Sequence, residues 1–221
     1  MNFLKTSLRT LLLSAAAGFC IGIGGIVFLM QTDKFAGAFL FAVGLLTILV
    51  FKLNLFTGMV GYLAEQLAAK KWGYLFTLLL VWLGNFAGTA LASLLISLTR
   101  SGDYFKAATA TLVAPKLADS WYSLVILGIF CGMLMFIAVD TYKKNIEKKD
   151  FLCCIAVFMG VMVFILAGFE HSIADMFYFV MSGKTLEALP ALAFITLGNA
   201  IGGNLIPLVQ MGAAALDTSK K

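Results

Sequence analysis

Charged residues and histidine are both scarce in this sequence. Only 12% of the 221 residues are charged, and His171 is the single histidine. A soluble domain is usually about one-quarter charged, whereas this chain is 62% hydrophobic. The composition therefore indicates an integral membrane protein that lies almost entirely in the bilayer. No stretch is long and polar enough for a separate soluble domain, so we expect residues 1–221 to form one transmembrane channel domain.

The cysteines lack the spacing of a metal site or a disulfide framework. All four lie in apolar segments, and none is near the histidine in sequence: Cys20, Cys131, Cys153 and Cys154. Because structural zinc sites need several closely spaced Cys and His ligands, we interpret these cysteines as buried packing residues and expect no cofactor.

Enzyme motifs are also missing. The chain has no phosphate-binding glycine loop and no nucleophile–base pair around His171, which argues against an enzyme. Asp140 and Asp175 could pair with His171 in space, so proton-transfer chemistry stays open. A sensor or scaffold would need a soluble domain or a long tail, and we expect neither. The net charge of +5 comes from basic residues in short loops, which is typical of membrane topology signals and does not indicate a nucleic-acid partner.

Long apolar segments fill the sequence. A bilayer core about 30 Å thick needs roughly 20 helical residues, and we predict six spans, at 8–30, 36–69, 74–99, 121–143, 151–182 and 188–213. The N-terminal segment resembles a signal peptide, but its apolar run is long enough to cross the membrane as the first helix. The second and fifth are too long for straight helices, and each has polar residues at its centre. We predict that both break there, since irregular backbone at membrane depth must be buried or line a cavity.

Lysine and arginine are unevenly distributed between the connecting segments. If the N-terminus lies inside, most of them fall in inner segments, as the positive-inside rule requires. We therefore expect a multi-pass protein of the cell (inner) membrane with both termini in the cytoplasm.

Short motifs recur in the two halves of the chain. GFCIG at 18–22 resembles GIFCG at 128–132, and LGNFAG at 83–88 resembles LGNAIG at 197–202. Each of the four contains Gly-xxx-Gly, a spacing that lets helices approach closely. We interpret these glycines as packing residues rather than as a pore lining.

The polar breaks fall at matching places in the two halves. Asn85 follows Thr57 by 28 residues, and Asn199 follows His171 by 28 residues. Because each half has three spans, the second half starts from the opposite side of the membrane. The pattern predicts a 3+3 inverted repeat, approximately 8–99 and 121–213, with the permeation site between the two breaks.

Two of these segments resemble signatures of the formate/nitrite transporter family. LFTG at 55–58 is similar to the family's LFT motif after the first break. GFEHSIADMF at 168–177 is similar to its motif at the second break, although Asp175 stands where Asn is common. The resemblance spans essentially the whole chain. It implies a six-helix, aquaporin-like fold, a homopentamer with one pore per protomer, and small monovalent anions such as formate, nitrite or hydrosulfide as permeants.

The resemblance also implies roles for individual residues. His171 matches the central pore histidine, and Thr57, which follows Leu55 and Phe56, matches its hydrogen-bonding partner. Lys116 falls near the outer approach to the pore. Phe41, Leu45 and Phe164 match the bulky apolar residues that form two constrictions of the pore in the family.

Some positions depart from the pattern of formate-type members. Gly132 stands where Asn is common, and Asn54, preceded by Lys52, stands where an acidic residue is common. Both departures look more like the hydrosulfide-conducting branch. Hydrosulfide is therefore the favoured permeant, with a formate or nitrite channel or proton symporter as the alternative. A neutral-solute, aquaporin-like pore is a more remote one.

The acid and base at the second break suggest a mechanism. A bare anion is costly in an apolar constriction, but a weak-acid anion can cross by taking up a proton. Histidine readily exchanges protons near neutral pH, so His171 could assist, while Lys116 and Lys52 would concentrate the anion. We expect Glu170 to cap loop amides or to pair across a protomer interface rather than to face the pore, since consecutive residues of a helix do not share a face.

Overall fold

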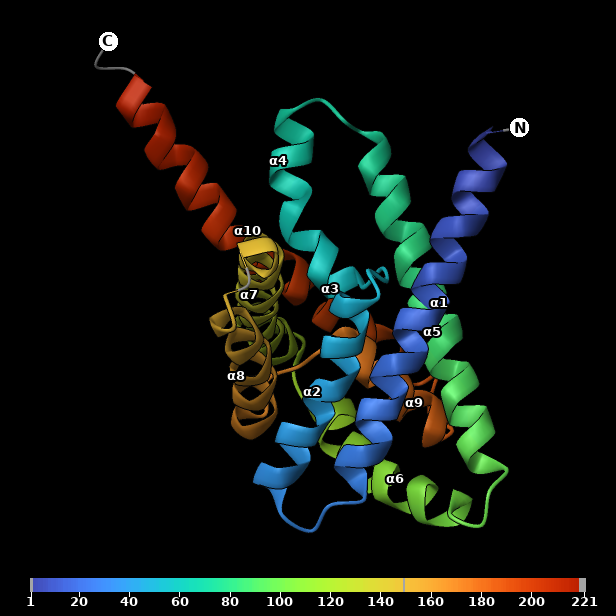
Figure 1. Cartoon of the computed structure of the whole chain (residues 1–221). Coiled ribbons are helices and arrows are strands. Elements are labelled where there is room, and N and C mark those ends of the chain that lie inside the picture. Colours follow the sequence, from blue (N-terminus) through green and yellow to red (C-terminus); the bar gives the residue numbers. More distant parts are fainter. Residues whose placement is uncertain (1, 149, 219–221) are drawn as a thin grey trace.

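The structure is a computed structural model that describes residues 2–148 and 150–218, and every regular element in this part is helical (Figure 1). The elements are α1 (Asn2–Leu29), α2 (Lys34–Val50), α3 (Phe56–Met59), η1 (Val60–Tyr62), α4 (Leu63–Ala68), α5 (Gly73–Ser97), α6 (Gly102–Ala118), α7 (Trp121–Asn145), η2 (Ile146–Lys148), α8 (Leu152–Ala167), α9 (Ser172–Met181) and α10 (Leu189–Thr218).

Several of these helices have the length and hydropathy of membrane spans. Among the described residues, α1, α5, α7 and α10 each pass both criteria, and α8 with α9 passes as a fifth, bent by 55° at the break between them. Helix α2 has 17 residues and is shorter than a usual span. It ends at Val50, and α3 begins only at Phe56. The chain is therefore an all-helical, multi-pass membrane-type protein.

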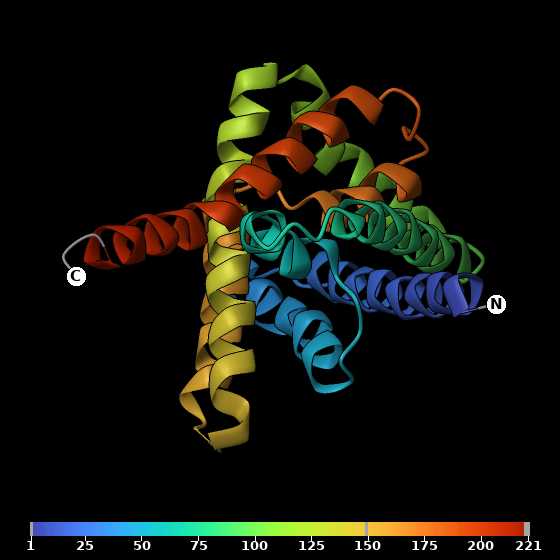
Figure 2. The ribbon, with the colours of Figure 1, turned by 90° about the horizontal axis from the view of Figure 1, so that it is seen from above.

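The helices pack in two groups. Helix α1 packs against α5 and α2, and α7 packs against α10 and α8. Figure 1 shows α7 and α8 nearly end-on while α1 and α5 run along the page, so α7 and α8 cross α1 and α5 steeply. Figure 2 shows α10 crossing α7, and α1 beside α5. The first turns of α1 and the last turns of α10 lie at the same end of the bundle, together with the connection between α4 and α5 (Figure 1).

The repeated glycines lie where these helices touch. A Cβ atom at Gly18 of α1 would overlap the backbone of Asn85 in α5, and a Cβ atom at Gly132 of α7 would overlap the backbone of Asn199 in α10. The predicted packing role of the glycine motifs is confirmed at these crossings. Gly132 in particular contacts α10. A glycine at this position is therefore explained by helix packing.

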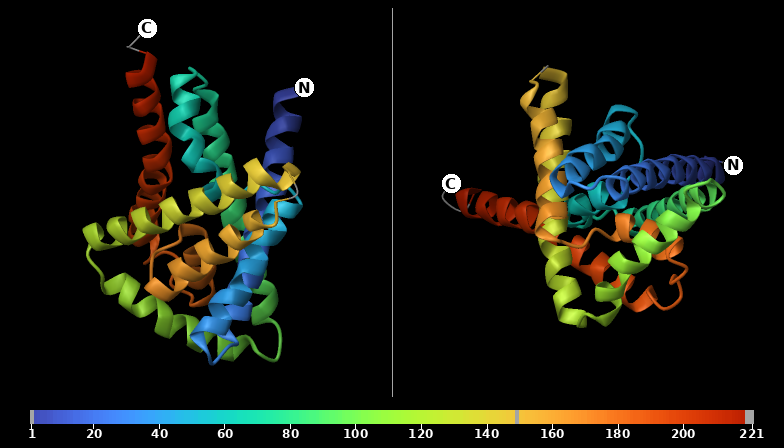
Figure 3. Two further views of the ribbon diagram at one scale, coloured as in Figure 1. Left: turned by 60° about the vertical axis from the view of Figure 1, so that its left-hand side comes forward. Right: turned by 90° about the horizontal axis from the view of Figure 1, so that it is seen from below.

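Helix α6 was not expected from the sequence, which was interpreted as connecting chain at residues 100–120. Its 17 residues include Pro115 and polar side chains, so neither length nor hydropathy marks it as a span. It lies across the end of the bundle opposite the helix termini of α1 and α10 (Figure 3) and packs against α9. This packing brings Lys116, in its last turn, to the second break.

Candidate functional site

A buried amide satisfies the irregular backbone of the first break. The Oδ1 atom of Asn85 accepts a hydrogen bond from the Phe56 N–H at 2.9 Å, and its Nδ2 donates to the Asn54 carbonyl at 2.9 Å and to the Ser14 carbonyl of α1 at 2.8 Å. Water cannot serve these groups inside a bilayer, and each unsatisfied one costs several kcal/mol, roughly. Asn85 therefore makes the interruption tolerable.

Asn199 plays the same part at the second break. Its Oδ1 accepts from the Ser172 N–H at 2.9 Å, and its Nδ2 donates to the Glu170 carbonyl at 2.8 Å and to the Gly128 carbonyl of α7 at 2.9 Å. Sequence reasoning noted the LGN motifs without assigning them this role. The equal spacing of each asparagine from its break was the available signal.

The two breaks meet through His171 and Thr57. His171 caps α9, since its Nδ1 accepts the Ala174 N–H at 3.1 Å, and its Nε2 lies 2.9 Å from the Thr57 Oγ1. With Nδ1 acting as an acceptor, the neutral ring carries its proton on Nε2 and donates it to the Thr57 hydroxyl. An imidazolium would point a second N–H at the Ala174 N–H, so the cap favours the neutral ring.

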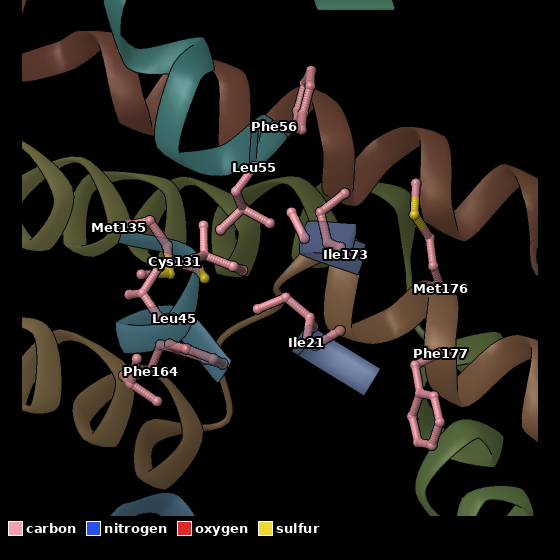
Figure 4. Close-up of a cluster of buried hydrophobic side chains, with 14 of the residues drawn as sticks. Ile21, Leu45, Leu55, Phe56, Cys131, Met135, Phe164, Ile173, Met176 and Phe177 are labelled. Carbon is pink, nitrogen blue, oxygen red and sulfur yellow. The ribbon is translucent and has the colours of Figure 1, made fainter. Parts of the chain in front are cut away.

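Apolar side chains surround this pair. The Phe164 ring stacks on the His171 ring at a centroid distance of 5.3 Å, and Phe41 packs edge-on against Phe164 at 5.9 Å. Leu45 and Leu55 line a small apolar space of about 20 Å³, here called the neck. Figure 4 shows Leu45, Leu55 and Phe164 in one cluster, whereas the Phe56 ring points away from it.

Two larger cavities adjoin this apolar centre. The carboxylate cavity, about 350 Å³, is lined among others by Lys116, Phe164, Glu170, His171 and Asp175. The tyrosine cavity, about 590 Å³, is lined among others by Lys52, Asn54, Tyr62, Tyr74 and Tyr142. The neck shares Ile48, Leu49, Leu53, Met59 and Lys143 with the tyrosine cavity. The neck and the tyrosine cavity therefore adjoin. Phe164, which lines the carboxylate cavity, lies in one apolar cluster with Leu45 and Leu55 of the neck (Figure 4).

The structure places Glu170 beside Lys116. Its carboxylate forms an ion pair with the Lys116 ammonium of the same chain and lines the carboxylate cavity. The expectation assumed a helix, but Glu170 and His171 lie in the segment between α8 and α9, where the helical rule on neighbouring residues does not apply.

Lys116 is also less free than its position in the sequence suggested. Its Nζ contacts Glu170 and lies 3.0 Å from the Asp175 Oδ1. Burial opposes the charged form of Lys116, yet the Asp175 and Glu170 carboxylates raise its pKa above the ordinary value. Lys116 stays charged, but two acids compensate that charge, so it is not an isolated attractor of anions.

The break residues before LFT lie at the other cavity. Lys52 has a left-handed backbone with φ of 53°, which directs the chain out of α2, and both Lys52 and Asn54 line the tyrosine cavity. Lys143 of α7 joins them and lies 4.7 Å from the Tyr62 ring centroid. Sequence reasoning missed Lys143 and Tyr62, which nothing in their local pattern distinguishes.

The fold and the site define a multi-pass membrane protein with a buried His–Thr contact beside a cavity. The sequence model of the formate/nitrite transporter family matches residues 2–211, and the chain belongs to this family, whose members are transporters and channels rather than enzymes.

Individual relatives agree with this assignment. The chain is 28% identical over 247 residues to the formate channel FocA of Escherichia coli (strain K12), with 91% of this chain and 85% of FocA covered. It is 28% identical over 177 residues to the nitrite transporter NirC of the same strain, with 74% and 65% covered. It is also 28% identical over 236 residues to the uncharacterized transporter YwcJ of Bacillus subtilis (strain 168), with 95% and 89% covered.

Solved structures share the fold. A pentameric formate channel with formate bound superposes with a TM-score of 0.74 at 20% identity, covering 96% of this chain and 98% of that chain. An FNT family ion channel gives a TM-score of 0.74 at 21% identity, covering 96% and 91%. At these identities the likeness establishes the fold, and function must be argued from the site.

Proposed function

We propose that this protein is a channel for small monovalent weak-acid anions of the formate and nitrite class. The observation that carries the proposal is the Thr57–His171 contact, which lies at the wall of the carboxylate cavity and is packed by Phe164 and Phe41. Two relatives that match most of this chain are a formate channel and a nitrite transporter. A pore that merely passed water or a neutral solute would not need an ammonium with two carboxylates at its approach.

The polar pair explains how a weak acid could cross the constriction. Because the Nε2–H of His171 donates to the Thr57 oxygen, the Thr57 hydroxyl proton stays available to the permeant. That O–H stabilises a permeant oxygen or sulfur, while Phe164 and Phe41 exclude the hydration shell of a bare anion. The permeant therefore crosses as the neutral acid, or nearly so, and the associated proton moves with it or returns afterwards.

Replacing His171 tests this role. In liposomes, the His171→Ala variant should carry formate more slowly than the wild type, with a different dependence on pH, because the Thr57 hydroxyl loses its fixed donor. Circular dichroism and size-exclusion profiles equal to those of the wild type would serve as the control. Normal flux at every pH would refute a role for His171 in permeation.

Hydrosulfide is the second candidate permeant. Lys52 and Asn54 line the tyrosine cavity. This approach therefore carries a positive group, and an amide stands at position 54, where the family resemblance implies an acidic residue in many formate-type members. Gly132, in contrast, gives no support, since it packs against Asn199. Comparing hydrosulfide and formate rates in the wild type and in Asn54→Asp tests this candidate. If the substitution leaves their ratio unchanged, the lining at position 54 does not select the permeant.

We further propose that the chain forms one domain of six crossings, arranged as a 3+3 inverted repeat with broken second and fifth spans. The matching hydrogen bonds of Asn85 and Asn199 support this arrangement. Each asparagine side chain donates to a backbone carbonyl 71 residues earlier in the chain. Each also bonds one N–H and one carbonyl of the backbone at its own break. We propose a homopentamer in the inner membrane with both termini in the cytoplasm, which places the tyrosine cavity inside and the carboxylate cavity outside.

A further inference from the structure

A second carboxylate accompanies Glu170 at the carboxylate cavity. The Oδ1 atom of Asp175 lies 3.0 Å from the Lys116 Nζ, and the Asp175 side chain is 2% exposed. Its other oxygen, Oδ2, is buried and has no hydrogen-bond partner among the residues that the structure describes. Buried polar atoms are almost always paired, so this oxygen indicates a proton or a ligand beyond the protein's own contacts.

The charges at this place do not balance if both acids are ionised. The groups that face Asp175 are Lys116 from α6, Glu170 and His171 from the break, Cys131 from α7 and Tyr178 from α9. Two more charged residues line the carboxylate cavity with partners of their own: Lys34 donates to the Leu166 carbonyl, and Asp119 accepts from Ser120 and Ser123. Cysteine and tyrosine are neutral, and the helix cap favours neutral His171. One ammonium thus faces two carboxylates. Two like charges that share a buried site do not both ionise, and such a pair retains one proton.

We propose that Glu170 and Asp175 hold a single proton between them, carried on the free Oδ2 of Asp175, and that this acid protonates the weak-acid anion in the carboxylate cavity. The inference rests on the proposed function. In the step, the O–H bond of Asp175 breaks and a bond forms between the proton and the anion. The neutral acid then moves on past His171. No electrons are exchanged with another reactant, and a proton from the solution on the side of the carboxylate cavity returns to Asp175.

This assignment gives different parts to the neighbouring groups. Lys116 stabilises the carboxylate that remains after the transfer. His171, with its proton used in the contact with Thr57, orients the hydroxyl that receives the neutral acid. The proton source is then Asp175, at the position where Asn is common in similar motifs, so the device belongs to chains that carry the acid there.

Infrared difference spectroscopy on the protein in lipid bilayers, without any permeant, tests the proton itself. The wild type should show the C=O stretch of a protonated carboxyl group at neutral pH, shifted in heavy water. The band should vanish in Asp175→Asn and also in Glu170→Gln, because either change leaves one carboxylate for one ammonium. Asp140→Asn is the matched control, since Asp140 pairs with Lys144 elsewhere, and it should keep the band.

A wild type without the band, or a band that persists in Asp175→Asn, would overturn the inference. If Asp175→Asn does not assemble, Glu170→Gln decides in the same way.

Flux then tests the transfer. Asp175→Asn should slow formate uptake at neutral pH by roughly 10²-fold, the lower end of what a positioned proton donor contributes. The rate should recover toward the wild-type value in acid, where the solution supplies the proton. Equal pH profiles in variant and wild type would contradict the transfer. A wild type that shows the band but passes no weak-acid anion would instead defeat the proposed function, so the two failures are distinguishable.

Discussion

At the scale of residues, the contact between His171 and Thr57 joins the two breaks and fixes the ring. The Nδ1 atom of His171 accepts a hydrogen bond from the Ala174 N–H, and its Nε2 atom bonds the Thr57 hydroxyl. Both side chains are almost fully buried. A buried polar group that loses its hydrogen-bond partner lowers the stability of the fold by about 1–3 kcal/mol. The pair therefore stabilises the folded state and also holds the Thr57 hydroxyl in place.

Thr57→Val keeps the shape of the side chain and removes this donor. We expect a free energy of unfolding lower by about 1–3 kcal/mol, because the His171 Nε2–H is left unpaired, and a large loss of formate flux. Thr57→Ser retains the hydroxyl and should stay close to the wild type in flux. Thermal unfolding in detergent and uptake in liposomes measure the two effects. A valine variant that conducts normally would show that the hydroxyl does not touch the permeant.

The resemblance to the family motifs predicted the contact between His171 and Thr57, and the structure contains it. The resemblance could not show that Lys116, Glu170 and Asp175 share one site. That meeting depends on how α6 lies across α9 and on the extended backbone around His171. Neither is encoded in a local periodicity.

At the scale of elements, two asparagines hold the segments that join α2 to α3 and α8 to α9. The polar centres of the apolar segments predicted irregular backbone at these two places, since a continuous apolar helix needs no such residues. The partners of the freed backbone groups could not be predicted, because they come from α1 and α5 at one break and from α7 and α10 at the other. Only the packed bundle brings them together.

Asn199→Ala should destabilise the fold strongly. It leaves the Ser172 N–H and the Glu170 carbonyl without their partner, and each buried unsatisfied group costs about 1–3 kcal/mol. Asn145→Ala is the control, because among the described residues the Asn145 amide donates to the Thr141 carbonyl alone, near the end of α7. Melting temperatures of the purified variants compare them. Equal melting temperatures would mean that Asn199 does not support the break.

Gly132→Ala tests the close approach of α7 and α10. The added Cβ meets the Asn199 backbone, and overpacking of this kind costs about 1–3 kcal/mol. Gly212→Ala in α10 is the matched control, since a Cβ atom there has nothing within 4 Å. Thermal unfolding should separate the two variants clearly. If Gly132→Ala were as stable as Gly212→Ala, the crossing would be looser than described, and position 132 would again be open to a role in the pore.

At the scale of the whole molecule, the chain is a membrane-type protein with many polar side chains gathered inside. Large apolar side chains on α1, α5, α7 and α10 are exposed on the single chain, for example Leu12, Leu79, Phe130 and Leu208. Lipid and, in the proposed pentamer, neighbouring protomers would cover them. The overall hydropathy predicted this class of protein, whereas α6 escaped notice because it is neither apolar nor long.

The central claim is that the protein conducts weak-acid anions, and a flux panel on purified protein in liposomes tests it most directly. Formate, nitrite, hydrosulfide and chloride would be compared side by side at one pH. Chloride is the discriminating member because it does not take up a proton under these conditions. The account predicts that the weak-acid anions pass and that chloride is much slower. Chloride passing as fast as formate, or none of the weak-acid anions passing, would contradict it.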